Sequence, residues 1–291
     1  MTGALFRRAR PWLGTLVEIQ LDGCAPDRAA SVCEKAFAEI AAIHRLMSFH
    51  EAGSDLGRLH RAGARTTLRV DRRTRDVLGW ALRIAAASDG CFDPTIAAQQ
   101  VAWGLLPRPA GSASPDPNAN WRDIELVGCA GVRLARPLWL DLGGIAKGYA
   151  VDRAMDILGD TGASQILINA GGDLRVRGAS ARVNVRTHAG LESSPRLELA
   201  NAALATSAPS GNTGHKRESR FSAHVHGRTR RPLALRRSVS VVAERCVVAD
   251  ALTKVVMAAS DRVALRVLRQ FRAQAGVCRG NGSWTLLGAA E

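Results

Sequence analysis

The stretch Asp141-Leu-Gly-Gly-Ile-Ala-Lys-Gly-Tyr-Ala150 is the most informative part of this 291-residue chain. Its two adjacent glycines allow the backbone to approach a ligand closely, and they precede a helical pattern whose first N–H groups favour a phosphate. Lys147 adds a charge suited to a pyrophosphate oxygen, and Asp141 could accept hydrogen bonds from a ribose or a heterocycle. The spacing matches neither the Walker loop nor the Rossmann fingerprint, and such a glycine pair is more often a simple tight turn. Alone, the stretch leaves both interpretations open.

The patterns on either side of this stretch predict a mixture of strands and helices. Pro137–Leu140 is predicted as a buried strand, a helical stripe runs from Ala150 to Leu158, and Gln165–Asn169 is predicted as another strand. Further strands are predicted at Thr15–Leu21, Ile124–Val127, Val132–Leu134, Pro195–Leu204, Ser238–Val242 and Trp284–Leu287, helices at Asp27–Arg45, at Thr74–Ser88 and after Ser260, and loops at Ser48–Arg58 and Leu105–Trp121. Strands and helices without regular alternation, and without internal repeats, predict an α+β fold.

Composition and charge exclude several classes of protein. Hydrophobic residues make up 46% of the chain and charged residues 23%, which is typical of a globular protein and not of a disordered or fibrous one. The formal net charge of +14 could serve an anionic ligand, a membrane surface or a nucleic acid. The arginines are scattered, however, with no long basic run and no interleaved aromatic residues, so we expect no nucleic-acid partner.

Cysteine spacing and the N-terminus bear on the cellular compartment. The six cysteines form no Cys-x-x-Cys pair, which argues against a zinc site and against a disulfide scaffold. No apolar stretch approaches the length of a transmembrane helix, so no membrane span is expected. The basic start of the chain lacks the apolar segment of a signal peptide, which predicts a cytoplasmic protein.

Three other motifs are candidates for chemistry. Asp250 and Thr253 lie three apart on one helical face and could offer oxygen ligands to Mg²⁺, although an Asp near a helix start often only stabilises the helix dipole. His224 and His226, two apart, could bind a metal or act in acid–base catalysis. Phe92-Asp93-Pro94-Thr95, taken alone, predicts an Asp-Pro turn after a buried Phe.

In order and spacing, these motifs resemble the ApbE family, the FAD:protein FMN transferases. The motifs that carry the resemblance are Met47-Ser48, Ser54-Asp55-Leu56, Phe92-Asp93-Pro94-Thr95, Trp103-Gly104, Asp141 to Asp152, Asn169-Ala-Gly-Gly-Asp173, Ala205-Thr206-Ser207 and Ala249-Asp250-Ala251-Leu252. The resemblance implies a single ApbE-like catalytic domain over residues 12–290, with residues 1–11 as a basic N-terminal extension. It also implies a T-fold-related α+β architecture, a mixed sheet and helices in two intertwined lobes with an FAD cleft between them.

The resemblance further implies the reaction and its residues. Mg²⁺ would bridge the pyrophosphate of FAD, and a Ser or Thr hydroxyl of an acceptor protein would attack the FMN phosphorus with release of AMP. The implied flavin-site residues are Met47, Phe92 and Asp93, the nucleotide residues are Asp141, Lys147 and Asp173, and the metal oxygens come from Gly144, Asp250 and Thr253. His224 would assist proton transfer, together with Asp250 as the second catalytic residue.

The chain departs from the family pattern at three places. The family usually has Asn where His60 stands, its histidine block is altered around His224, and Lys254 stands where a metal-binding Thr often lies. Two alternatives to the transferase share the same motifs: an FAD pyrophosphatase that yields FMN and AMP, and a non-catalytic flavin-binding protein. Members of the family are often exported, in contrast to the location predicted from this N-terminus.

Overall fold

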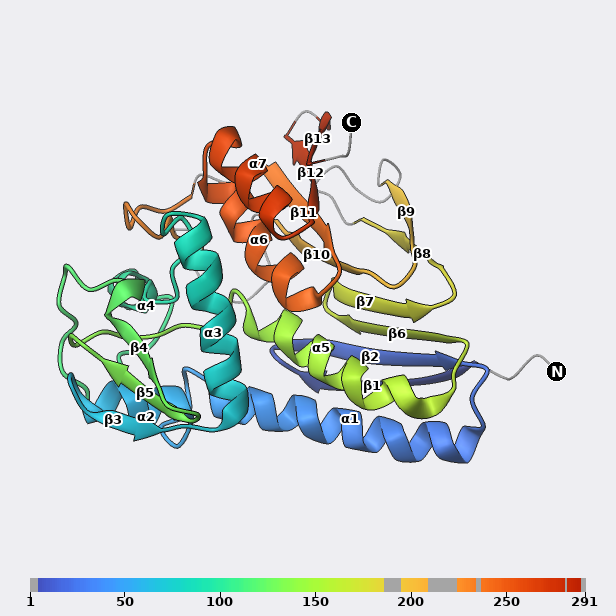
Figure 1. Cartoon of the computed structure of the whole chain (residues 1–291), viewed down its shortest axis with the longest axis horizontal. Coiled ribbons are helices and arrows are strands. Elements are labelled where there is room, and N and C mark those ends of the chain that lie inside the picture. Colours follow the sequence, from blue (N-terminus) through green and yellow to red (C-terminus); the bar gives the residue numbers. More distant parts are fainter. Residues whose placement is uncertain (1–4, 186–194, 209–223, 234–236, 281, 289–291) are drawn as a thin grey trace.

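One antiparallel sheet runs through the computed structural model, which describes residues 5–185, 195–208, 224–233, 237–280 and 282–288 (Figure 1). Its eight strands follow the order β1-β2-β6-β7-β10-β11-β12-β13, and each neighbouring pair is antiparallel. Their bounds are β1 (Phe6–Trp12), β2 (Thr15–Asp22), β6 (Gln165–Ala170), β7 (Asp173–Gly178), β10 (Ala203–Ser207), β11 (Arg237–Ala243), β12 (Gln274–Arg279) and β13 (Trp284–Leu287). A separate antiparallel pair is formed by β8 (Ala181–Asn184) and β9 (Arg196–Leu199).

Alternating side chains explain how this sheet joins the core. In β2, Val17, Ile19 and Leu21 are buried, while the residues between them are partly exposed. The same alternation in β6 buries Ile166 and Ile168. Because a strand has a period of two, these side chains lie on one face of the sheet, where they share a hydrophobic core with the helices.

Four helices lie against that face. They are α1 (Pro26–Met47), α5 (Ala146–Leu158, continued by the 3-10 turn η2, Gly159–Thr161), α6 (Cys246–Ala258) and α7 (Asp261–Gln270). Helix α1 packs along α5 and α5 packs along α6, while α5 lies on β6 and β7 and α6 lies on β10 and β11 (Figure 1). The packing of α5 on α6 brings the glycine-loop motif and the Asp250 motif together, although a hundred residues of sequence separate them.

A second, smaller lobe is inserted between α1 and α5. Its elements are α2 (Asp55–Ala62), β3 (Thr67–Arg69), α3 (Arg72–Ala87), α4 (Ala97–Ala102), the 3-10 turn η1 (Trp121–Asp123), β4 (Ile124–Val127) and β5 (Gly131–Leu134), with the strands in the order β3-β5-β4. Helix α3 packs against α1 and α6, and the lobe occupies the left side of Figure 1. Since the chain leaves the large sheet after α1 and returns at α5, the α+β fold in two intertwined lobes is confirmed.

Three predicted elements differ in the structure. Pro137–Leu140 is largely buried but is not a strand, because its backbone bonds to no neighbouring strand that the structure describes: the Pro137 carbonyl accepts from the Asp116 N–H at 2.8 Å, and the Leu140 N–H donates to His60 Nε2 of α2 at 2.8 Å. The predicted loop Ser48–Arg58 already contains the start of α2, where Ser54 accepts from the Gly57 N–H at 2.9 Å as an N-cap. The predicted strand Pro195–Leu204 is two strands, β9 and β10, because the chain turns at Asn201, which has φ +50°.

The N-terminal segment also differs from the expectation. From Phe6 onward the expected basic extension is the edge strand β1, which pairs along its whole length with β2. Arg7 forms an ion pair with Glu18 of β2, and Arg10 forms one with Glu34 of α1. Among the helices of the described ranges, none has the length and apolar character needed to cross a membrane.

Candidate active site

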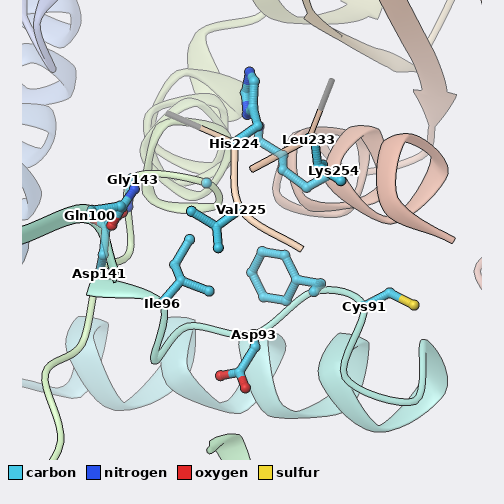
Figure 2. A pocket seen from close by; sticks show the side chains of 12 residues that line it. Cys91, Asp93, Ile96, Gln100, Asp141, Gly143, His224, Val225, Leu233 and Lys254 are labelled. Atoms are coloured by element: carbon cyan, nitrogen blue, oxygen red, sulfur yellow. Dashed lines mark hydrogen bonds between the residues drawn. The ribbon is translucent and has the colours of Figure 1, made fainter. Parts of the chain in front are cut away.

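A cavity of about 230 Å³ lies where the inserted lobe meets the loop before α5 and the helix α6 (Figure 2). Its lining residues are Cys91, Phe92, Asp93, Ile96, Gln100, Asp141, Gly143, Gly144, His224, Val225, Leu233 and Lys254. Figure 2 shows Gln100, Asp141 and Gly143 together on one side of the cavity, with His224 and Lys254 on another. The cavity therefore brings together candidate residues from the Phe92 motif, the glycine loop and the His224 segment, which lie far apart in the sequence.

The glycine loop forms one wall of this cavity. Asp141 Oδ1 accepts a hydrogen bond from the Gly143 N–H at 2.9 Å, which closes a tight turn directly ahead of α5. Burial raises the pKa of the Asp141 carboxyl, and the hydrogen bonds from Gly143 and from the Gln100 side chain oppose that rise. A Cβ atom at Gly144 would lie 3.5 Å from Phe92 Cε2 and 3.6 Å from Lys254 Cε, so this residue faces the cavity and both side chains.

Four charged side chains form a cluster beside the loop. Lys147 of α5 forms an ion pair with Asp173 of β7, and its Nζ lies 3.9 Å from Asp250 Oδ2. Lys254 of α6 forms an ion pair with Asp250, which is fully buried. Burial opposes ionisation of Asp250, but Lys147 and Lys254 outweigh it and lower the pKa of this carboxyl. Burial likewise opposes the charge of Lys147, whose pKa is raised by Asp250 and Asp173. The cluster is therefore two carboxylates held between two ammonium groups.

Turn geometry in the β6–β7 hairpin places Asp173. Asn169 Oδ1 accepts from the Gly172 N–H at 2.8 Å, and Gly171 and Gly172 have φ values of +68° and +106°. Positive φ values of this kind are easily adopted only by glycine. The Asn-Ala-Gly-Gly-Asp motif is therefore a structural turn whose last residue reaches Lys147.

Asp152 is a positioning residue to which the sequence argument assigned no role. Its carboxylate accepts from the N–H groups of Cys246 at 3.0 Å and Val247 at 2.9 Å, and so caps the start of α6. It also pairs with Arg175 of β7 at 2.7 Å. The sequence did contain a signal for this role: Asp152 follows Val151 in the apolar stripe of α5, which indicates burial. A buried carboxylate needs hydrogen-bond or ionic partners, so a structural role could have been expected.

Helices α5 and α6 approach closely at Gly148. The Gly148 N–H donates to Asp250 Oδ2 at 3.0 Å. A Cβ atom at Gly148 would lie 2.3 Å from the Cys246 carbonyl oxygen and 2.8 Å from Asp250 Cβ, and neither atom is the end of a flexible side chain. The helix pair therefore depends on glycine at this position.

Gly148→Ala should lower the free energy of unfolding by about 1–3 kcal/mol, because the new methyl group forces two backbones apart. Urea unfolding followed by circular dichroism measures this change. Gly79→Ala in α3 is the matched control, since its Cβ would meet no atom closer than 3.8 Å. That variant should gain roughly 0.5–1 kcal/mol through helix propensity. Equal shifts for the two variants would contradict the close approach of α5 and α6.

His224 and His226 have separate surroundings. His224 lines the cavity, and burial, followed by the charge of Lys254, lowers its pKa to about 4. His226 does not line it; its Nδ1 accepts from the Arg228 N–H at 3.2 Å within a turn. The backbone at these residues forms an isolated bridge between Val225 and Pro232. Among the described residues, the two imidazoles belong to no group of side chains that could hold a metal ion. The low pKa of His224 keeps its imidazole neutral at physiological pH.

The remaining predicted residues divide between the cavity and the core. Phe92 lines the cavity, whereas Met47, the last residue of α1, is buried in the main core and is not a lining residue. Asp93 lies at the cavity edge, but its carboxylate accepts from the Thr95 N–H at 2.8 Å and pairs with Arg230 at 3.0 Å. Figure 2 shows that carboxylate directed away from His224. These contacts indicate that Asp93 stabilises the loop conformation.

The oxygen ligands implied for Mg²⁺ do not fit a divalent cation in this chain. Asp250 already contacts Lys254 and lies near Lys147, so a dication would face two ammonium groups. The Thr253 hydroxyl is fully buried, donates to the Asp250 carbonyl at 2.7 Å and shares a hydrogen bond with Ser207 at 2.7 Å. Of the three implied ligands, the Gly144 backbone alone faces the cavity directly.

His60, where the family usually has Asn, lies behind the glycine loop. Its side chain is buried, and burial lowers its pKa to about 4. As a neutral imidazole it accepts the Leu140 N–H and thereby holds the segment that leads into Asp141. In this chain His60 supports the loop and does not line the cavity.

Solved structures share this fold. The apbe protein from Thermotoga maritima superposes with a TM-score of 0.83 at 24% identity, covering 98% of this chain and 97% of that one. A mutant form of Flavin Transferase ApbE from Vibrio cholerae superposes with a TM-score of 0.82 at 21% identity, covering 98% of both chains. The fold is thus the one found in solved flavin transferases of this type.

Sequence comparison identifies the family. The model of the ApbE family matches residues 13–278. The FAD:protein FMN transferase of Salmonella typhimurium is 24% identical over 278 residues, 89% of this chain and 79% of the relative. That of Vibrio cholerae is 27% identical over 241 residues, 77% of this chain and 72% of the relative. The chain belongs to the ApbE family.

Proposed function

We propose that this chain transfers the FMN moiety of FAD to a Ser or Thr hydroxyl of an acceptor protein and releases AMP. The observation that carries the proposal is the cavity lined together by the glycine loop, by neutral His224 and by Lys254, which pairs with Asp250. Membership of the ApbE family, whose curated relatives bear the name FAD:protein FMN transferase, supports the same reaction.

The cavity offers separate regions for the parts of FAD. Phe92, Ile96 and Val225 give an apolar surface suited to a flavin ring, and Asp141 can accept hydrogen bonds at its rim. The glycine loop ahead of α5 lets the backbone approach a phosphate closely, and Lys254 supplies a positive charge beside Gly144. Phosphoryl transfer depends mainly on such positioning and charge neutralisation.

His224 is assigned the proton transfer. Its pKa of about 4 keeps the imidazole neutral at physiological pH, so it can accept the proton of the attacking hydroxyl. The hydroxyl oxygen forms a bond to the FMN phosphorus, the bond from that phosphorus to the AMP oxygen breaks, and AMP leaves with the electron pair. The product is an acceptor protein with a phosphoester-linked FMN.

Mg²⁺ belongs to the reaction that the resemblance implies, where it would supply counter-charge to the pyrophosphate. Gly144, Asp250 and Thr253 would be its ligands. Because the contacts of Asp250 and Thr253 do not fit a dication in this chain, the step described above relies on the ammonium groups alone.

An assay with and without acceptor tests the proposal. The protein is incubated with FAD and a flavin-acceptor protein of the related enzymes; AMP is measured by chromatography and acceptor-bound flavin by in-gel fluorescence. We expect AMP and labelled acceptor in equal amounts, and neither with an acceptor whose target hydroxyl residue is replaced by Ala. AMP without acceptor would instead identify a pyrophosphatase, and bound FAD without turnover would identify a flavin-binding protein.

A further inference from the structure

We propose that the ammonium group of Lys254 takes the place of a divalent cation at Asp250, so that this chain binds the pyrophosphate of FAD without Mg²⁺. The inference rests on the function proposed above, because it concerns the same substrate in the same cavity. It extends that function by naming the group that neutralises the phosphates.

The first support is how Lys254 is held. It lies one helical turn after Asp250 in α6, and its Nζ contacts a carboxylate oxygen and donates to the carbonyl oxygen of Asp250 at 3.0 Å. Two oxygen atoms of one residue thus hold a single positive centre. The side chain is only 18% exposed, and the exposed part faces the cavity.

The second support is where the charge lies. The Lys254 stem passes Gly144, since a Cβ atom on that glycine would lie 3.6 Å from Lys254 Cε. The same side chain lines the cavity with His224, and its charge contributes to the low pKa of that imidazole (Figure 2). The Lys254 side chain therefore lies beside the glycine loop and lines the same cavity as the base proposed to activate the hydroxyl.

The third support is the balance of charge in the cluster. Lys147 is paired with Asp173, and Lys254 is paired with Asp250, so each carboxylate already has one cationic partner. A dication added at Asp250 would leave an excess of two positive charges in a largely buried site before any substrate arrives. A lysine ammonium, by contrast, is a compact point charge that proteins commonly use against phosphates.

FAD affinity in the presence and absence of metal tests the inference. Quenching of flavin fluorescence gives the Kd in excess EDTA and in millimolar MgCl₂, and titration calorimetry with MgCl₂ alone reports metal binding without FAD. For the unaltered protein we expect the same Kd in both buffers and no heat from MgCl₂. Lys254→Thr should lose at least about tenfold in affinity in EDTA and recover it in MgCl₂, because the vacated Asp250 then accepts the metal.

Lys254→Arg is the matched control, because it keeps a positive charge and should bind FAD equally in EDTA and MgCl₂. A Kd of the unaltered protein that rises tenfold in EDTA would overturn the inference, as would a Lys254→Thr protein whose affinity stays high in EDTA. In either case Mg²⁺-supported labelling of the acceptor would leave the proposed function intact. Absence of FAD binding in both buffers would overturn both proposals.

Discussion

His224→Gln is expected to lower the rate of FMN transfer by about 10²–10⁴-fold, the usual contribution of a general base. Glutamine keeps a polar side chain of similar reach but cannot take up the proton of the attacking hydroxyl. The Kd for FAD should stay unchanged, because the contacts assigned to the pyrophosphate come from Lys254 and the glycine loop. Single-turnover labelling of the acceptor with preloaded FAD separates the chemical step from binding.

His226→Gln is the matched control for this variant. Its imidazole accepts a backbone N–H in the neighbouring turn and does not line the cavity, and a glutamine oxygen can accept the same bond. Transfer by His226→Gln should match that of the unaltered protein. A His224→Gln protein that retains a tenth or more of the rate would exclude His224 as the base.

The pH dependence of the same step has a defined direction. With a pKa of about 4, His224 is neutral in the folded protein at all pH values above about 5, so its protonation should limit transfer only below that range. The unfolded chain protonates this residue near pH 6.5, roughly its ordinary pKa. Between those two pKa values the unfolded state binds more protons, and the free energy of unfolding falls as the pH is lowered. Urea titrations at several pH values measure how the free energy of unfolding changes with pH.

Asp250→Ala is expected to lower the free energy of unfolding by about 3–5 kcal/mol, the usual effect of removing one partner from a buried ion pair. The carboxylate is fully buried, pairs with Lys254 and accepts the Gly148 N–H, so its loss leaves an unpaired ammonium and an unsatisfied donor. FMN transfer should fall as well, because Lys254 is no longer held at the cavity. Urea unfolding and acceptor labelling measure the two effects.

Glu125→Ala provides the comparison for Asp250→Ala. Glu125 forms an ion pair with Arg133 on the surface of the inserted lobe, where 41% of the glutamate side chain is exposed. Pairs of that kind contribute about 0–1 kcal/mol because solvent screens them. If Asp250→Ala cost no more than Glu125→Ala, the charge cluster would not be the structural centre of the site.

Local patterns predicted part of the regular elements, but they missed the strands β1, β7 and β12 of the large sheet. The period-two alternation of Thr15–Leu21 corresponds to β2, because solvent on one side and core on the other set this pattern directly. Trp284–Leu287 corresponds to β13, although none of its side chains is buried. Pro137–Leu140 has an equally apolar composition, yet it bonds to His60 and to the inserted lobe. Whether an extended segment joins a sheet depends on distant neighbours, which no local pattern records.

The site was predictable to a similar degree. The glycine loop, Phe92 and His224 do line one cavity, as their motifs indicated. The ion pairs of Asp93 with Arg230 and of Asp250 with Lys254 were not predicted. Both depend on side-chain directions that are set by packing between separate segments. Residue type and spacing show that a carboxylate is present, but they do not show which positively charged side chain pairs with it.

Strand β1 has a consequence for how molecules of this protein meet one another. Among the described strands it is an outer strand of the large sheet and pairs with β2 alone, and an outer strand offers backbone groups that could pair with another chain. The strand carries the charged residues Arg7, Arg8 and Arg10, two of which pair with Glu18 and Glu34, and Pro11 removes one backbone donor. Charged side chains and a proline on an outer strand are features that oppose edge-to-edge pairing of two sheets.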